Sequence, residues 1–270
     1  MKKIIGILVV LMAFVLDGTA QMYRNEPAFK DGEYAKYNVY YNWGFIWIHA
    51  GDVEFSVKEK KINGQSYYEL KLSGFTIKSF DHLYTIRDTF VSVVTKTELM
   101  PYYYREVKHE DSYFCDRKYS FSHEKDNSKI YWQLNRKGKL SSDTMEIEKS
   151  VFDLLTTCYR FRSLDVAKVK ENSVIPFDMV FDEEIYSLGM RYKGKETIKM
   201  HGTKDKYQAL KFVPKLITGD LFKNEDDMAI YVSADDNHVP LYIEAKIKVG
   251  AVKVMLETVK NTKYPMSSMK

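Results

Sequence analysis

The chain of 270 residues carries 41 Lys and Arg against 37 Asp and Glu, and the two signs alternate along the sequence. This balance excludes the basic clustering that a nucleic-acid-binding surface requires, so we expect no nucleic acid as a partner. The 21 tyrosines and 15 phenylalanines instead favour strands, because aromatic side chains suit the half-buried surface of a pleated sheet.

The first 20 residues have the pattern of a secretory signal peptide. Lys2 and Lys3 form a positive start, residues 4–16 form an apolar run too short to span a bilayer, and Ala20 ends a small-residue cleavage motif. Cleavage there removes Lys2, Lys3 and Asp17, so the net charge falls from +4 to +3. No second apolar run of membrane-spanning length follows. We therefore expect an exported protein without a transmembrane segment after signal cleavage.

Alternation of apolar and polar residues recurs from Tyr34 onward and is typical of β-strands. Turn signals such as Asn63-Gly64 join these runs directly, and strands joined so directly must be antiparallel, because parallel pairs need long crossovers. We predict an all-β fold of one or two strongly curved antiparallel sheets, partly open and barrel-like. The sequence predicts a single domain over residues 21–270, with a core from about residue 28 to 265. The predicted strands cover residues 34–41, 45–57, 68–72, 85–95, 102–109, 113–123, 129–134, 193–200, 207–213, 229–233 and 241–256.

One segment breaks the alternation. Apolar residues recur at helical spacing from Val151 to Phe161, and Ser150 with Asp153 has the spacing of a capping box. The pattern predicts one amphipathic helix near residues 150–162 that packs on the sheet.

Arg162 is the exception on this helix, because a rotation of about 100° per residue points it near the middle of the apolar stripe. Two interpretations are open. The guanidinium reaches past the last turn toward the terminal carbonyls, where a cation is favoured, or it pairs with a carboxylate of the sheet. Asp88 is the first candidate partner and Glu33 is the second.

The two cysteines, Cys115 and Cys158, also allow two interpretations. An oxidising compartment would preserve a disulfide between them. Alternatively both are small buried hydrophobic residues, since Cys158 lies on the apolar face of the predicted helix and Cys115 lies beside aromatic residues. Nothing near either thiol would lower its pKa, so a cysteine nucleophile is not expected.

Patterns typical of catalysis or metal binding are missing from the sequence. It contains no Gly-x-Ser-x-Gly elbow and no phosphate-cradling glycine loop, and its six histidines lack metal-ligand spacing. Asp226-Asp227 and Asp235-Asp236 fall at opposite ends of one predicted strand, and turn chemistry explains the second pair. We therefore expect no enzymatic activity, no cofactor and no bound metal.

Aromatic density is the one positive indication of function. A sheet buried on one face explains the aromatic residues without any ligand. An apolar cavity inside a strongly curved sheet would instead hold a lipid or another hydrophobic ligand, and a flat aromatic platform would bind a sugar or a partner protein. The candidate ligand-binding residues are Trp43, Phe45, Trp47, Tyr84, Phe152 and Tyr159.

Short motifs with a characteristic order and spacing extend along nearly the whole mature chain. They are Phe29-x-Asp31-Gly32-Glu33, Trp43-Gly44, Ala50-Gly51, Tyr84-x-x-x-Asp88, Leu99-x-Pro101, Asp153-Leu154-Leu155, Tyr159-x-x-Arg162, Ser233-x-Asp235-Asp236-x-x-x-Pro240 and Gly250. Together these motifs resemble the bacterial domain of unknown function family 3108. The resemblance implies an exported, mostly antiparallel β protein of the Gram-negative periplasm or outer envelope, with no established activity. In architecture alone, the expected fold is similar to periplasmic lipoprotein carriers, in which a curved sheet holds acyl chains under a helical lid.

The expected function is non-catalytic binding or carriage of a hydrophobic envelope component such as a lipid. The alternative is a structural or adaptor module that docks on an outer-membrane protein or glycan. A carrier needs an enclosed apolar cavity, whereas an adaptor needs an exposed apolar patch, so the structure bears on both.

Overall fold

A computed structural model describes residues 22–124, 127–215 and 227–269. The predicted signal peptide and Asp226 lie outside these residues. All fifteen described strands belong to one sheet. The strands are β1 (Tyr34–Trp43), β2 (Ile46–Ile62), β3 (Gln65–Thr76), β4 (Arg87–Thr95), β5 (Pro101–Glu110), β6 (Tyr113–Ser122), β7 (Lys129–Arg136), β8 (Lys139–Glu146), β9 (Val151–Phe152), β10 (Val174–Phe181), β11 (Glu184–Lys199), β12 (Lys206–Pro214), β13 (Met228–Ser233), β14 (Pro240–Lys246) and β15 (Ala251–Lys260).

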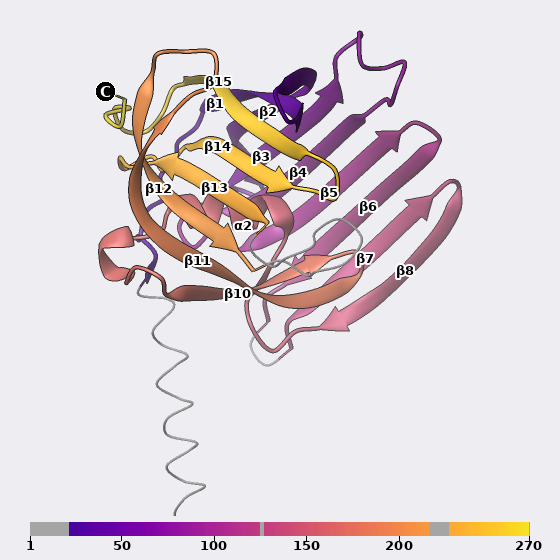
Figure 1. Ribbon diagram of the computed structural model, residues 1–270. Helices are drawn as coiled ribbons and strands as arrows, with labels where there is room; N and C mark the ends of the chain where they lie inside the picture. Colours follow the sequence, from indigo (N-terminus) through magenta and orange to yellow (C-terminus); the bar gives the residue numbers. More distant parts are fainter. Residues whose placement is uncertain (1–21, 125–126, 216–226, 270) are drawn as a thin grey trace, which may run out of the picture.

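The strand order is β8-β7-β6-β5-β4-β3-β2-β1-β15-β14-β13-β12-β11-β10-β9. β1 lies in the middle and pairs with both β2 and β15, so the two halves of the chain join there. Residues 147–150 connect β8 to β9, the two ends of the sheet, and so short a segment spans at most about 18 Å. The sheet must therefore curl until its ends approach each other. Figure 1 shows the result, with β2–β8 as one wall and β10–β14 facing it. This confirms the predicted all-β, partly open, barrel-like fold.

One strand pair departs from the antiparallel rule. β9 pairs in parallel with β10, through Val151 opposite Asp178 and Phe152 opposite Met179. The helix α2 (Leu154–Arg162) and the 3₁₀ helix η2 (Val166–Lys168) form the crossover between these two strands, the connection that a parallel pair requires.

The helix α2 lies inside the curve of the sheet, between its two walls (Figure 1). It begins later than the predicted boundary, because Val151 and Phe152 are extended in β9. Asp153, and not Ser150, is the N-cap, and its Oδ1 accepts a hydrogen bond from the Thr156 amide at 2.9 Å. The buried Ser92 hydroxyl on β4 donates to the same carboxylate at 2.5 Å. This bond ties the start of α2 to one wall.

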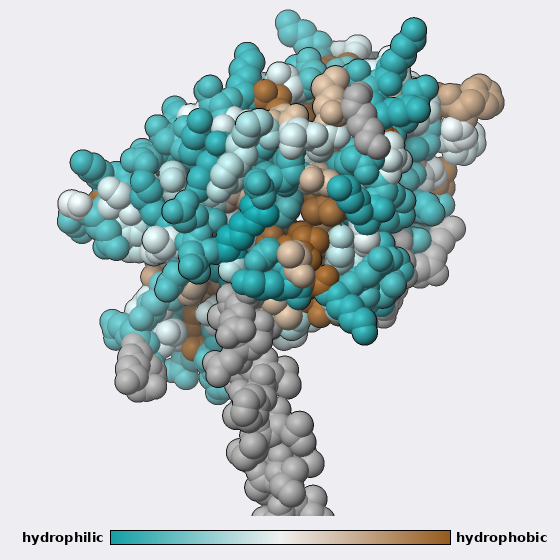
Figure 2. Space-filling model, turned by 90° about the vertical axis from the view of Figure 1, so that its left-hand side faces the viewer, coloured by the Kyte–Doolittle hydropathy of each residue, from teal (hydrophilic) through white to brown (hydrophobic). Residues whose placement is uncertain are grey.

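Side chains of α2 fill the core between the walls. Leu155 and Tyr159 are 1% and 3% exposed and pack in one cluster with Phe29 and Leu70. The predicted amphipathic helix, packed on the sheet, is confirmed. The outer face in Figure 2 is mostly hydrophilic, with apolar side chains recessed in a hollow near its centre.

The structure contains no bond between the two cysteines, which are both free thiols. Cys115 is buried on β6, as the second interpretation requires. Cys158 is accessible to solvent, so its interpretation as a buried side chain is wrong. Desolvation by the surrounding protein nevertheless raises the pKa of Cys158 to about 11, and burial raises the pKa of Tyr37 on β1, with a small further contribution from Cys158. The thiol therefore faces the space that the curved sheet encloses.

Replacement of Leu155 by alanine should lower the free energy of unfolding by about 2–5 kcal/mol, because it leaves a cavity in the packed core. Denaturant melts measure this loss. Cys158→Ala is the matched control on the same helix and should cost less than about 1 kcal/mol, since that side chain is accessible. Equal, small losses in the two variants would mean that α2 is a loosely held cover.

Candidate functional site

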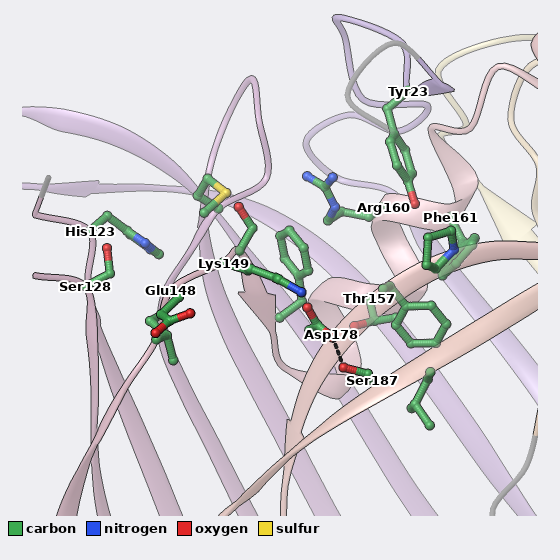
Figure 3. A pocket seen from close by; sticks show the side chains of 17 residues that line it. Tyr23, His123, Ser128, Glu148, Lys149, Thr157, Arg160, Phe161, Asp178 and Ser187 are labelled. Carbon is green, nitrogen blue, oxygen red and sulfur yellow. Dashed lines mark hydrogen bonds between the residues drawn. The ribbon is translucent and has the colours of Figure 1, made fainter. Parts of the chain in front are cut away.

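A cavity of about 810 Å³ opens where the two ends of the sheet approach without pairing. It lies between the connections β6–β7 and β8–β9 on one side and α2, β9, β10 and β11 on the other (Figure 3). Its volume falls within the range of small-molecule sites, which is roughly 300–1,000 Å³. The short connection between β8 and β9 creates this gap, because it brings the sheet ends together without bridging them.

Much of the cavity wall is apolar. Phe161 of α2 and Phe177 of β10 meet edge to face, with their ring centroids 5.1 Å apart. Phe152 of β9 is 6% exposed and lies beside them in the lining. The apolar lining residues are Met100, Ile147, Phe152, Phe161, Pro176, Phe177 and Leu188.

Arg160 brings a positive charge into this wall. Its guanidinium carbon lies 4.1 Å from the ring centroid of Phe152 and 4.6 Å from that of Tyr23. Its Nη1 donates a hydrogen bond to the Glu98 carbonyl at 2.6 Å. Desolvation between the rings lowers the pKa of Arg160. Among the described residues no carboxylate lies within salt-bridge distance of this guanidinium, although the charges of Tyr23 and Glu98 raise its pKa and partly offset the desolvation.

Other polar groups lie around the same cavity. The side chain of Lys149 extends toward its middle, and Glu148 projects from the same connection (Figure 3). Asp178 of β10 accepts a hydrogen bond from the Ser187 hydroxyl of β11 at 2.5 Å. The imidazole Nε2 of His123 donates to the Pro101 carbonyl at 2.6 Å. The cavity therefore combines apolar walls with two cations, Arg160 and Lys149, and two carboxylates, Glu148 and Asp178.

The structure does not bring the six predicted aromatic residues into one site. Of these, only Phe152 lines the cavity. Trp43 and Phe45 stand at the turn between β1 and β2, 61% and 94% exposed. Aromatic density in the sequence reflects the preference of these residues for strands, and it does not determine which of them share a face or an end of the sheet.

The remaining three of the six have separate environments. Trp47 stacks on His201, with ring centroids 3.8 Å apart. Tyr84 is 40% exposed in the connection between β3 and β4. Tyr159 packs against Phe29 in the core, at 4.8 Å between centroids. The structure thus places these three residues at surface and core positions outside the cavity.

Sequence reasoning missed Arg160, because a charged residue outside the apolar stripe of an amphipathic helix is expected to face solvent. A helix enclosed by a curved sheet has no outer face, so its polar side lines the interior. The available signal was the combination of two predictions, a strongly curved sheet and a helix packed on it. Together they place Thr157 and Arg160 inside the molecule.

Arg162 forms a buried bidentate pair with Glu33. Its Nη1 lies 2.5 Å from Oε1 and its Nη2 lies 3.0 Å from Oε2, while its Nε donates to the Asn237 carbonyl at 3.2 Å. The second predicted partner is therefore correct, and the predicted exit toward solvent is wrong. Asp88 is not the partner, because its carboxylate on β4 accepts from the His109 amide of β5 at 3.1 Å.

The turn between β13 and β14 completes this anchor at the end of α2. The Nδ1 of His238 donates to the Arg162 carbonyl at 2.8 Å. Burial lowers the pKa of His238 to about 4, so the ring is neutral at pH 7. Asp235 accepts from the Ser233 hydroxyl at 2.8 Å and from the Asn237 amide at 3.1 Å. The predicted turn role of Asp235 is confirmed.

A second charged cluster closes the barrel beyond the cavity. Arg117 of β6 is 1% exposed and pairs with Glu106 of β5 and with Glu183, and its Nη2 lies 2.7 Å from Asp182. Asp182 and Glu183 form the tight turn between β10 and β11, with φ of 47° and 60°. Arg117 therefore holds the tip of this hairpin against the opposite wall. Among the described residues, no group of three or more His, Cys, Asp or Glu side chains is arranged to hold a metal ion.

Residues 36–257 match the model of the family described as Protein of unknown function (DUF3108). The chain belongs to this family. Several residues of the motifs that resemble it, among them Glu33, Arg162 and Asp235, meet at the end of α2. These three motif residues therefore belong to the anchor of the helix.

A solved structure has a similar fold. It is described as the beta-barrel-like protein of domain of unknown function DUF1849 from Brucella abortus, with a TM-score of 0.57 and 9% sequence identity over 87% of this chain and 100% of that chain. At this identity the likeness concerns the fold alone. A search of curated proteins found no match to the present chain. The described helices include none with the length and apolar character to cross a membrane.

Arg162→Lys should destabilise the protein nearly as much as Arg162→Ala, by about 3–5 kcal/mol in a denaturant melt, because lysine cannot form the bidentate pair and Glu33 stays buried and charged. The matched control is Arg105→Lys. Arg105 pairs with Asp116 at 2.8 Å, but its side chain is 44% exposed, so that change should cost at most about 1 kcal/mol. A neutral Arg162→Lys would contradict the structural role of the pair.

His238 should make stability fall as the pH drops from about 6.5 to 4. In this window the unfolded chain binds a proton that the folded chain rejects, so up to about 3 kcal/mol of stability is present above pH 6.5 and lost toward pH 4. His238→Asn keeps a donor at the place of Nδ1 and should remove this part of the pH dependence of Tm. Other titrating groups, such as Asp88 with its pKa raised to about 6, are common to both proteins. If Tm changed with pH in the same way in His238→Asn and in the unmodified protein, the pH dependence would not come from His238.

Proposed function

We propose that this protein binds an amphiphilic ligand, consisting of an apolar chain and an anionic head group, in the cavity between the ends of the sheet. The role is non-catalytic carriage of such a component in the bacterial envelope, to which the signal-peptide pattern of residues 1–20 would direct the chain. The observation that carries the proposal is Arg160, a partly desolvated cation between two aromatic rings of the cavity wall, which forms no salt bridge with a described carboxylate.

The apolar lining supports the chain of the ligand. Phe152, Phe161 and Phe177 contribute aromatic surface from three different elements, and Ile147 and Leu188 extend it. Burial of an acyl chain against such a wall is favourable by about 0.8 kcal/mol per methylene group. When only water fills the cavity, contact between water and this apolar surface is unfavourable in free energy.

Arg160 supports the anionic head group. Burial of a charge is costly unless the charge is paired, and the two flanking rings remove water from the guanidinium. One donor is used by the Glu98 carbonyl, and the others are available to a carboxylate or phosphate, which a guanidinium binds in bidentate geometry. Lys149 adds a second positive charge at the cavity.

The test compares palmitate with hexadecanol, which has the same chain length but no charge. The protein should bind palmitate more tightly, and Arg160→Gln should weaken palmitate binding by about 10- to 100-fold while leaving hexadecanol binding nearly unchanged, because only the charge-assisted bonds are lost. Isothermal titration calorimetry measures both affinities.

Arg105→Gln is the control, because it removes an arginine from an exposed pair on the sheet outside the cavity. Its palmitate affinity should equal that of the unmodified protein. Equal weakening by the two variants would show that only the net charge of the protein matters. Failure to bind either ligand would contradict the proposal.

A further inference from the structure

Exposed apolar side chains gather at one end of the sheet, away from the cavity. Among the described residues thirteen large hydrophobic side chains are exposed, and six of these lie on or beside three connections between strands. We name this set the apolar rim. It consists of Trp43, Phe45, Ile46, Leu83, Tyr84 and Val249.

The three connections are neighbours, because their strands are adjacent in the sheet. Asn42 at the end of β1 pairs with Ala251 at the start of β15, and the Tyr41 hydroxyl donates to the Val249 carbonyl at 3.0 Å. On the other side, the Ile77 amide donates to the Ala50 carbonyl of β2 at 3.1 Å. The turns β14–β15 and β1–β2 and the connection β3–β4 therefore follow one another along one end of the barrel.

The apolar rim projects and forms no groove. Phe45 is 94% exposed at the tip of its turn, and Gly44 before it has φ of +60° with no atom within 4 Å of the position of a Cβ. Leu83 and Val249 are 66% and 59% exposed on the flanking connections. Separate convex tips of this kind offer apolar contact without the concave shape that holds a folded protein segment.

The three segments that carry the tips contain three lysines and one carboxylate, while Asp227 lies beside Lys246 and Glu110 beside Tyr84. Residues 42–48 and 246–250 contain Lys246 and Lys248 and no carboxylate, and residues 77–84 add Lys78. Asp81, the acidic residue of that last segment, is paired with Arg87 at 2.6 Å. Glu110 and Asp111 lie on the following turn, beyond Tyr84. The positive charge of the segments around Trp43 and Phe45 therefore complements an anionic surface of a partner.

We infer that the apolar rim inserts into the head-group region of an anionic lipid bilayer. Trp and Tyr are favoured at this depth because their rings are apolar and their polar atoms stay hydrated, while Phe45, Leu83 and Val249 reach the acyl chains. The neighbouring lysines add electrostatic attraction to anionic lipids. The inference does not depend on the ligand proposed for the cavity. His123, Ser128 and the connection 147–150, which line the cavity, lie at the opposite strand ends, so docking leaves the cavity accessible.

The experiment uses the protein as purified from cells. It is mixed with vesicles of phosphatidylethanolamine and the anionic lipid phosphatidylglycerol. The protein should sediment with these vesicles, and less with neutral phosphatidylcholine vesicles or at high salt. A double variant, Trp43→Ser with Phe45→Ser, should bind at least about ten-fold more weakly. Tyr131→Ser is the control, because Tyr131 is 48% exposed on β7, away from the apolar rim, and it should bind like the unmodified protein.

Brominated lipids give a second readout, which reports the depth of Trp43 directly. Quenching of tryptophan emission by these lipids should persist in Trp132→Phe, because Trp132 lies on β7 away from the apolar rim. It should fall in Trp43→Phe, which removes the tryptophan expected to enter the bilayer. Equal vesicle binding by the double variant and the control would overturn the inference. A protein that stays in solution as a monomer would also overturn the inference. A dimer that the double variant abolishes would overturn it as well, because the apolar rim would then be an interface between two copies.

Discussion

The buried pair of Glu33 and Arg162 determines how the helix sits inside the barrel. It joins the start of β1 to the end of α2, and Asn237 and His238 add the turn between β13 and β14 to the same point. A buried ion pair contributes little net stability, because desolvation offsets most of its attraction. The pair instead specifies a single orientation of α2 in the barrel. With Asp153 fixed to Ser92 at the other end, α2 has one orientation in which its charges are satisfied.

That orientation explains the two unusual residues of the helix. Leu155 and Tyr159 fill the core, so the remaining faces of α2 point into the enclosed space and toward the gap in the sheet. Cys158 consequently contacts solvent inside the molecule, and Arg160 reaches the cavity between two aromatic rings. The anchor at Arg162 and the candidate site at Arg160 are therefore two consequences of one helix position.

Much of this fold follows from the sequence, because alternation and turn signals are local properties. The helix, the antiparallel order, and Glu33 as the second candidate for Arg162 could all be predicted. β8 could not, since every residue from Lys139 to Glu146 except Met145 is exposed and its pattern carries no alternation. The cavity could not be predicted either, because it depends on the distant β10 and β11 reaching the connection 147–150. Aromatic content predicted strands correctly, but it did not predict which aromatic residues share one site.

The protein has two surfaces of different chemistry, a cavity with Arg160 in its apolar wall and an apolar rim at the opposite strand ends. A carrier of amphiphilic molecules would use the first to hold its ligand and the second to approach a bilayer. Native mass spectrometry of protein purified from the bacterial envelope tests the central claim, the bound ligand, most directly. The account predicts an added mass of an acidic lipid, which is lost in Arg160→Gln. A protein that retains no added mass, or retains the same mass in both forms, would contradict it.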